Sequence, residues 1–263
     1  MKNIKVVNDK DAPIAIFDSG LGGVSVLREM VKLMPAEDMY YFGDSANAPY
    51  GTKSIDEVRR MTISHVEEFM AKGCKGVVIA CNTATSAAVR RLREMYPELP
   101  IVGIEPAVKP AVEAYPHGNI LVMATPMTIH QEKLKHLIET YGGEANVIPL
   151  ACPGLMDFVE VGNVDSPELK GFMRDLLYQY VGKLDAVVLG CTHYPFVAKV
   201  VREVLGDEVE IFDGGYGTAK EIKRRLGEQG LLIENTTKKG EIIFENSIKS
   251  QQKIDLFWKL LKM

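Results

Sequence analysis

Two of the four cysteines, Cys81 and Cys191, stand in matching contexts that suit acid and base chemistry. Each follows a short apolar run, Gly76–Ala80 in one case and Ala186–Gly190 in the other, and each precedes a segment that we predict to be helical. A helix N-terminus favours a thiolate and lowers the pKa of a thiol below its free value of about 8.5. One cysteine in such a context is as often structural as chemical, but a matched pair favours chemistry.

A pair of thiols with suitable pKa values can act in turn as general base and general acid. One thiolate would remove a proton from a carbon, and the other thiol would return a proton to the opposite face, which inverts that carbon. The other two cysteines, Cys74 and Cys152, are expected to be small packing residues. None of the four forms a CxxC or a Cys/His spacing typical of zinc, so we predict no metal site.

Short apolar runs, typical of strands buried on both faces, alternate with helical patterns along the chain. The expected strands are Ile14–Phe17, Met39–Phe42, Gly76–Ala80, Ile101–Ile104, Ile120–Ala124, Asn146–Leu150, Ala186–Gly190 and Glu210–Phe212. Helical stripes cover residues 58–69 and 196–205, and Pro195 suits a first helical position. Near the C-terminus, Gly240–Ile248 predicts a strand and Gln251–Lys262 an amphipathic helix. The alternation predicts an α/β protein with mostly parallel sheets.

The sequence contains a weak internal repeat. Residues 76–83 resemble residues 186–193 in pattern, and residues 14–19 resemble residues 120–125. Two similar doubly wound domains that face each other across a cleft would explain both resemblances.

We therefore predict a first domain of residues 1–104 plus 213–263, which carries Cys81, and a second of residues 105–212, which carries Cys191. Ligands of open α/β sheets bind outside the carboxyl ends of the strands. The polar residues expected at those ends are Asp18-Ser19, Asp44-Ser45, Cys81-Asn82-Thr83, Thr125 and Cys191-Thr192-His193.

The composition excludes several classes of protein. The chain has 263 residues, of which 46% are hydrophobic and 25% charged, and a formal net charge of -4, unlike the basic footprint of a nucleic-acid binder. No apolar run approaches the roughly 18–20 residues of a membrane span, and Met1–Asp11 lacks the apolar stretch of a signal peptide. We expect a cytoplasmic protein with no nucleic-acid or membrane partner.

Four strings, in their order and spacing over nearly the whole chain, resemble the motifs of the glutamate racemase family. They are Phe17-Asp-Ser-Gly-Leu-Gly-Gly23, Gly43-Asp-Ser-Ala-Asn-Ala-Pro-Tyr-Gly51, Ala80-Cys-Asn-Thr-Ala84 and Gly190-Cys-Thr-His-Tyr-Pro195. The related aspartate racemases also use two cysteines, but the Pro-Tyr-Gly and Cys-Thr-His-Tyr-Pro strings resemble the glutamate enzymes more. The resemblance implies racemisation of L- and D-glutamate without a cofactor, D-glutamate for peptidoglycan, and a homodimer. The N-terminus lacks the long extension of activator-dependent members, so we expect basal activity without an activator.

The resemblance also implies roles for individual residues. Cys81 would accept the proton of the D-enantiomer and Cys191 that of the L-enantiomer. Asp18 would assist near Cys81, and His193 near Cys191. Two further carboxylates of the family's site match Glu160 and Asp44. The residues that would hold the substrate are Ser19, Pro49, Tyr50, Gly51, Asn82, Thr83, Thr125, Thr128 and Thr192. Backbone N–H groups and hydroxyls at these positions can bind carboxylates.

Each of these residues has a plainer interpretation. Asp18 could cap the next helix, and Tyr50-Gly51 could be only a turn after Pro49. His193 could be a structural histidine, and Glu160 could lie on a solvated helix face. His65, on a helical apolar stripe, is expected to be a packing residue, whereas the remaining histidines are expected at the surface: His117, His130 and His136.

The sequence also has to be weighed against other functions. The glycines after the first strand do not match GxGxxG, because position 25 is Ser25, so they predict a tight turn and close helix packing rather than a nucleotide site. A pyridoxal-phosphate racemase needs a Schiff-base lysine, and no lysine stands in a convincing strand-end motif. The alternatives to a glutamate racemase are an aspartate racemase and a non-catalytic two-lobed binder of acidic amino acids.

Overall fold

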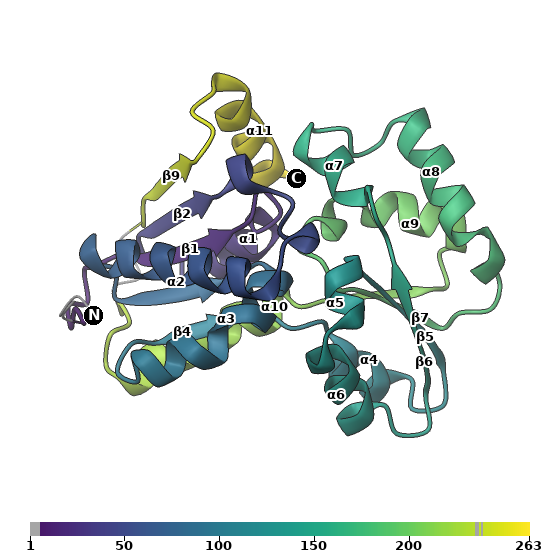
Figure 1. Ribbon diagram of the computed structural model, residues 1–263, viewed down its shortest axis with the longest axis horizontal. Helices are drawn as coiled ribbons and strands as arrows, with labels where there is room; N and C mark the ends of the chain where they lie inside the picture. The colour runs from purple at the N-terminus through teal and green to yellow at the C-terminus, as the bar shows by residue number, and fades with distance from the viewer. Residues whose placement is uncertain (1–5, 235–236, 238) are drawn as a thin grey trace. The chain divides into compact units, whose positions relative to one another are not determined.

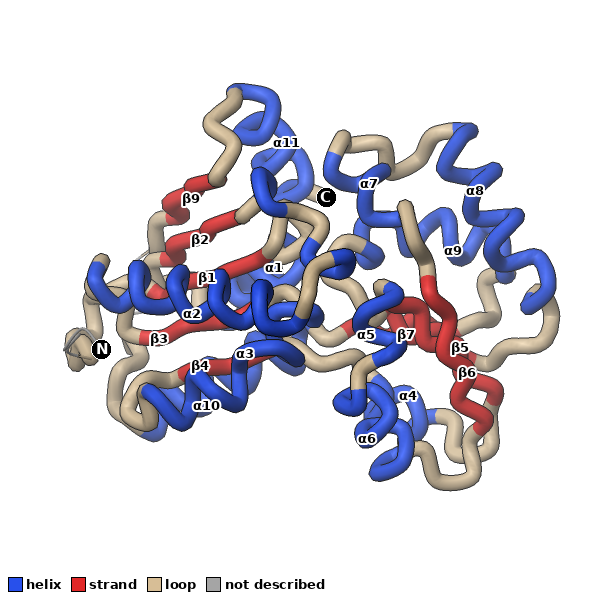
Figure 2. The backbone as a smooth tube through the Cα atoms, viewed as in Figure 1, coloured by secondary structure: helices blue, strands red, loops and turns tan. Residues whose placement is uncertain are grey.

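The computed structural model describes residues 6–234, 237 and 239–263, so residues 1–5 of the first predicted domain lie outside the described residues. The chain divides into two compact units, one made of residues up to Ile104 together with Gly215–Lys262, and the other of Glu105–Gly214. Each unit contains one sheet of parallel strands with helices packed on it (Figures 1 and 2). The predicted α/β class with parallel sheets is confirmed.

The sheet of the first unit contains β1 (Ile14–Asp18), β2 (Met39–Gly43), β3 (Gly76–Ile79), β4 (Ile101–Gly103) and β9 (Ile242–Asn246). The order across the sheet is β4-β3-β1-β2-β9, and every pairing is parallel. All residues of β1 and β3 are buried, as expected for continuous apolar runs covered on both faces. The strand predicted near the C-terminus is confirmed as β9, at the edge of the sheet.

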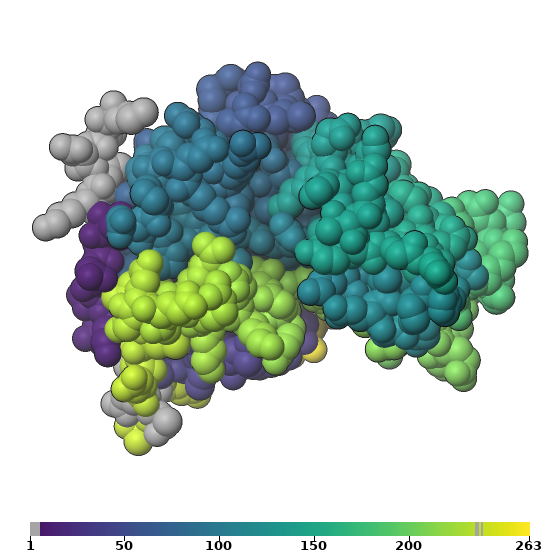
Figure 3. All heavy atoms as spheres, turned by 90° about the horizontal axis from the view of Figure 1, so that it is seen from below, coloured from purple at the N-terminus to yellow at the C-terminus, as the bar shows by residue number. Residues whose placement is uncertain are grey.

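Helices cover both faces of this sheet (Figure 1). On one face α1 contacts α10 and α11, and on the other α2 contacts α3. Their bounds are α1 (Val24–Leu33), α2 (Ile55–Ala71), α3 (Asn82–Met95), α10 (Gly215–Glu228) and α11 (Gln251–Lys262), with the 3₁₀ helices η1 (Ser45–Asn47) and η2 (Tyr50–Thr52) between β2 and α2. Helix α10, yellow-green in Figure 3, packs beside β4. Its Arg225 donates to the carbonyl of Ile101, the first residue of β4, at 3.4 Å. The C-terminal residues Gly215–Lys262 thus pack with residues up to Ile104 in the first unit.

The sheet of the second unit has the order β6-β5-β7-β8, again with parallel pairings. Its strands are β5 (Asn119–Ala124), β6 (Asn146–Ala151), β7 (Ala186–Leu189) and β8 (Glu210–Asp213). Its helices are α4 (Val108–Ala114), α5 (Pro126–His130), α6 (Glu132–Tyr141), α7 (Leu155–Glu160), α8 (Pro167–Leu177) and α9 (Ala198–Leu205), with the 3₁₀ helices η3 (Tyr178–Tyr180) and η4 (Tyr194–Val197). Helix α4 packs on one face, where its apolar residues and those of β5 and β7 form a buried core. Among the described residues no helix is long and apolar enough to cross a membrane.

The two sheets repeat one strand order. Read from one edge, the first gives β4-β3-β1-β2 and the second gives β8-β7-β5-β6. In this correspondence β1 matches β5 and β3 matches β7, which are the pairs of segments that resemble each other in sequence. Cys81 follows β3 by two residues and Cys191 follows β7 by two residues, so the two cysteines occupy equivalent positions in their sheets.

Gly23 allows α1 to begin close to the carboxyl end of the first sheet. A Cβ atom at Gly23 would lie 2.7 Å from Asp18 Cβ and 3.0 Å from Ala80 Cβ. The backbone of Gly23 has an ordinary helical conformation, with φ −60°. Of the two predicted roles, a tight turn and close helix packing, the close packing is confirmed at Gly23.

Replacing Gly23 by alanine should lower the free energy of unfolding by about 1–3 kcal/mol, the usual cost of overpacking. Gly171 is the matched control, because a Cβ at this position in α8 meets no atom within 4 Å. Gly171→Ala should be neutral or raise stability by about 0.5–1 kcal/mol, since alanine favours the helix interior. Urea denaturation measures both changes, and an unchanged Gly23→Ala protein would contradict the close approach.

Candidate active site

Asp18 and Ser19 lie at the carboxyl end of β1, and both are buried. The Asp18 carboxylate accepts a hydrogen bond from the Gly20 backbone N–H at 2.9 Å. The N-cap of α1 is Gly23, so the interpretation of Asp18 as a helix cap is wrong. The Asp18 carbonyl accepts from the Asp44 N–H at 3.0 Å, which ties the end of β1 to the end of β2.

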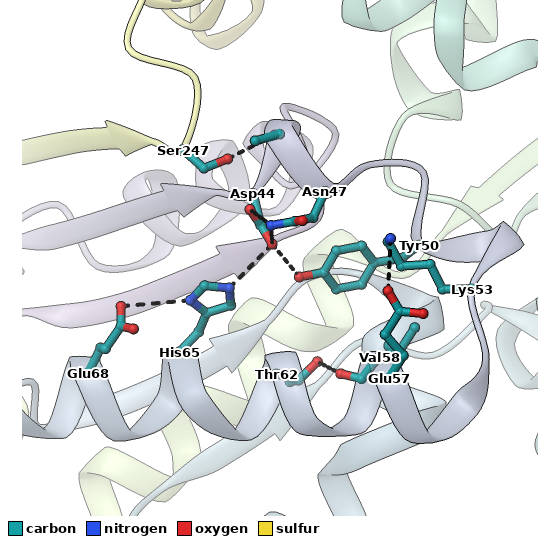
Figure 4. Close-up of polar contacts among 11 residues, drawn as sticks. Asp44, Asn47, Tyr50, Lys53, Glu57, Val58, Thr62, His65, Glu68 and Ser247 are labelled. Carbon is teal, nitrogen blue, oxygen red and sulfur yellow. Dashed lines mark hydrogen bonds and ion pairs between the residues drawn. The ribbon is translucent and has the colours of Figure 1, made fainter.

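Asp44, directly after β2, is buried and surrounded by hydrogen-bond donors (Figure 4). Its Oδ2 atom accepts from the Tyr50 hydroxyl at 2.7 Å and lies 3.3 Å from His65 Nε2, and Asn47 Nδ2 donates to both carboxylate oxygens. Burial alone would raise the pKa of Asp44, but the hydrogen bonds from His65, Tyr50, Asn47 and Ser247 together lower the pKa to about 2. Asp44 is therefore a carboxylate at neutral pH.

The Pro-Tyr-Gly string follows this carboxylate. Tyr50 begins η2 and is buried, whereas Pro49 is exposed and Gly51 is half-buried. Burial and the hydrogen bond to Asp44, with the charges of Asp44, Cys81 and Asp18, hold the pKa of Tyr50 far above its ordinary value. The string is thus more than a surface turn, because the Tyr50 side chain is fixed in the interior beside the strand ends.

Cys81 is the N-cap residue of α3 and is buried. Its Sγ atom accepts from the Ala84 backbone N–H at 3.5 Å, so Cys81 lies at a helix N-terminus as predicted. Asn82 and Thr83 are also buried, and the Asn82 Oδ1 atom has no hydrogen-bond partner among the residues that the structure describes. Because buried polar atoms are nearly always paired, this oxygen is a candidate acceptor for a bound ligand.

Cys191 has a different environment. It lies between a strand and a helical segment as predicted, but that segment begins as the 3₁₀ helix η4 and not as an α-helix. A turn and the 3₁₀ helix η4 separate it from α9, which begins at Ala198. Pro195 lies in η4, where the missing proline N–H is tolerated. The Cys191 Sγ atom instead lies 3.6 Å from His193 Nδ1.

His193 connects Cys191 to Glu160. His193 Nε2 lies 2.8 Å from Glu160 Oε1, and the His193 ring is buried. Burial would lower the pKa of His193, but the hydrogen bonds to Cys191 and Glu160 outweigh it and raise the pKa well above 6.5. Glu160 ends α7 with its side chain 12% exposed, so the interpretation as a solvated face is wrong. A protonated imidazole therefore lies beside the Cys191 sulfur.

The remaining candidates of the second unit lie at the ends of β5 and β7. Thr125 caps α5, since its hydroxyl oxygen accepts from the Thr128 N–H at 3.3 Å, and the two hydroxyl oxygens are 3.0 Å apart. Thr128 and Thr192 are buried. Cys152, after β6, is buried too, and burial together with the charge of Cys191 raises its pKa to about 12. This thiol stays protonated, as expected of a packing residue.

The structure gathers the candidates into two sets, one in each unit, at the carboxyl ends of the strands. The first set comprises Asp18, Ser19, Asp44, Pro49, Tyr50, Gly51, Asn82, Thr83 and Cys81, and the second comprises Thr125, Thr128, Glu160, Thr192, His193 and Cys191. Sequence reasoning assigned His65 to packing only and missed its contact with Asp44. Within the part of the chain that the structure describes, no cluster of His, Cys, Asp and Glu is arranged to hold a metal ion.

Comparisons with known proteins identify relatives over nearly the whole chain. The profile of the family described as Asp/Glu/Hydantoin racemase matches residues 14–222. A protein of Clostridium perfringens named glutamate racemase is 48% identical over 255 residues, 97% of this chain and 98% of its own length. The crystal structure of glutamate racemase from Francisella tularensis with D-glutamate has a TM-score of 0.82 at 26% identity, over 97% of this chain and 95% of that one. The enzyme of Thermus thermophilus with beta-chloro-D-alanine has a TM-score of 0.79 at 34% identity, over 96% and 94%.

Replacing Glu160 by glutamine should lower the pKa of His193, because it removes the negative charge that stabilises the imidazolium. NMR titration of the His193 ring measures the shift, and the resonance of the exposed His117 should respond to pH alike in both proteins. A raised folded-state pKa stabilises the fold below the unfolded value of about 6.5, and this stabilisation is lost as pH rises through the folded value. The unfolding free energies of wild type and variant should therefore differ most at about pH 6 and converge in alkali. An unchanged His193 titration would contradict the pairing.

Proposed function

The chain belongs to the Asp/Glu/Hydantoin racemase family, and on this premise we propose that it interconverts L-glutamate and D-glutamate. The names of the relatives support glutamate as the substrate, since proteins 45–48% identical over nearly the full length are called glutamate racemases. A related structure holds D-glutamate. The activity is an isomerisation, as in the rest of the family.

The observation that carries the proposal is the equivalence of Cys81 and Cys191 across the internal repeat. Each follows a matching central strand of its sheet, β3 or β7, and each is buried with a local feature that favours a thiolate. Inverting an α-carbon requires one group that removes a proton and another that returns a proton to the opposite face. Two thiols at equivalent positions can serve as these two groups.

We assign Cys191 as the base for L-glutamate. The imidazolium of His193, 3.6 Å from the sulfur, favours the thiolate, and Glu160 accepts from Nε2 and so fixes the orientation of the ring. Proton removal from Cα leaves negative charge on the carbon and the adjacent carboxylate. The Cys81 thiol then supplies a proton to the other face and gives D-glutamate.

Cys81 is the base in the reverse direction. The N-terminus of α3 and the Ala84 N–H favour its thiolate without a neighbouring imidazole. We assign Asp18 as the residue that assists Cys81 in proton transfer, on the basis of its match to the family motif and its burial at the neighbouring strand end. The mechanism uses side chains of the protein alone.

Glutamate binding is assigned to the backbone and hydroxyl groups at the strand ends. Glutamate presents two carboxylates and one ammonium group, which need donors and acceptors respectively. The unpaired Asn82 Oδ1 can accept from the ammonium group, and backbone N–H groups can bind a carboxylate. The proposed binding residues are Ser19, Pro49, Tyr50, Gly51, Asn82, Thr83, Thr125, Thr128 and Thr192. We further propose that the enzyme is a cytoplasmic homodimer that supplies D-glutamate for peptidoglycan.

Replacement of Cys81 or Cys191 by serine should reduce racemisation of either enantiomer by at least about 10³-fold, because a serine hydroxyl is a far weaker acid and base at these sites. Circular dichroism follows the interconversion, and reactions in D₂O should place deuterium at Cα of the product. Cys74→Ala is the matched control, since Cys74 is a buried packing residue whose pKa is raised to about 11 by burial. Racemisation that persists in either serine variant would rule out the two-thiol mechanism.

The same assay separates the competing functions. D-glutamate and L-aspartate, incubated separately with the wild-type protein, should give loss of optical signal only with D-glutamate. Loss with aspartate alone would identify an aspartate racemase. Binding of glutamate with no proton exchange at Cα would identify a non-catalytic binder.

A further inference from the structure

We infer that His65, which lies outside all the residues assigned above, is a positioning residue that holds the loop of Tyr50 and Gly51 in its glutamate-binding conformation. The inference rests on the proposed function, because it concerns the loop to which glutamate binding is assigned. Its starting point is the contact of His65 Nε2 with Asp44 Oδ2 at 3.3 Å (Figure 4).

The chemistry of this contact determines the donor. Asp44, with a pKa of about 2, is a carboxylate that can only accept hydrogen bonds. His65 Nε2 must therefore carry the hydrogen. The same Oδ2 atom accepts from the Tyr50 hydroxyl at 2.7 Å, so one oxygen links His65 on α2 to Tyr50 on η2.

The surroundings of His65 hold its ring in the donating orientation. The ring packs against both Phe17 and Phe42, with centroid distances of 5.1 and 4.9 Å. The His65 side chain is 15% exposed, and its Nδ1 atom lies 3.7 Å from Glu68 Oε2, beyond hydrogen-bond distance. A phenyl ring could replace the packing, but it could not replace the donor.

Side chains that follow or end β9 also form hydrogen bonds with this loop, but at its first residues. On the side of β9, the Ser247 hydroxyl accepts from the Ala46 N–H at 2.8 Å, and Asn246 donates to Ser45 at 2.9 Å. Between Asn47 and Gly51, the side chain of Tyr50 is the one that enters the interior. The link from His65 through Asp44 to Tyr50 thus connects this segment to α2, and just beyond it Lys53 pairs with Glu57 of α2 at 3.0 Å.

The test compares His65→Phe, which keeps a flat ring and removes the donor, with His65→Gln, whose amide nitrogen can replace Nε2. His65→Phe should raise KM for both enantiomers about tenfold with kcat nearly unchanged, as expected when a hydrogen bond to a charged group that supports substrate binding is lost. His65→Gln should remain within about threefold of the wild-type KM. The matched control is His117→Phe, an exposed position in the second unit, which should leave KM unchanged.

A second measurement does not depend on glutamate. Hydrogen exchange of the full chain without ligand should show about tenfold faster exchange in residues 44–52 of His65→Phe and near wild-type exchange in His65→Gln. Because His65 and Tyr50 donate to one oxygen, the effects of His65→Phe and Tyr50→Phe on KM should also be non-additive.

Each outcome decides the inference. A His65→Phe protein with a lower Tm but unchanged KM and loop exchange would show that His65 only packs. Equal defects in His65→Phe and His65→Gln would also overturn the inference, because the donor would then be irrelevant. If the wild-type protein fails to racemise glutamate, the proposed function fails, and the exchange of residues 44–52 decides the role of His65 by itself.

Discussion

Parallel strand pairing is the constraint on which the candidate site depends. In each sheet all strands point the same way, so their carboxyl ends meet at one edge, and the residue after each strand lies beside the residues after its neighbours. The contact of the Asp44 N–H with the Asp18 carbonyl shows this directly, since it joins the ends of β1 and β2. Residues separated by tens of positions in the chain thereby become neighbours, and buried polar groups at this edge find partners from adjacent strands.

The two thiols lie at equivalent places in the repeated sheets but have different neighbours. Cys81 lies at the first turn of a regular α-helix and gains a backbone N–H. Cys191 is followed by a turn and a 3₁₀ helix, which offer no comparable helix terminus, and a histidine supported by Glu160 lies beside it instead. A helix terminus supplies a fixed partial charge, whereas an imidazole supplies a full charge that can titrate.

The sequence predicted the strands well, because strands buried on both faces leave continuous apolar runs such as those of β1, β3 and β7. It did not predict that Pro195 lies in a 3₁₀ helix, since an apolar stripe after a proline fits either helix type. It also could not predict that His65 contacts Asp44. Its apolar neighbours on α2 correctly indicated a partly buried packing residue, but the partner carboxylate lies 21 residues away on a different element. Periodicity reports which face of a helix is buried and carries no information about polar partners from other strands.

The ends of β2 and β6 correspond in the repeat, but they carry different charges. Asp44 follows β2, and Tyr50, His65, Asn47 and Ser247 surround it, so a buried negative charge is tolerated there. Cys152 follows β6, close enough to Cys191 that the charge of Cys191 raises its pKa, and it stays a neutral thiol. A carboxylate at position 152 would place a second negative charge beside Cys191 and disfavour the thiolate that His193 supports. Hydrogen-bond donors thus stabilise a buried carboxylate at the end of β2, whereas the neutral Cys152 thiol at the end of β6 adds no charge beside Cys191.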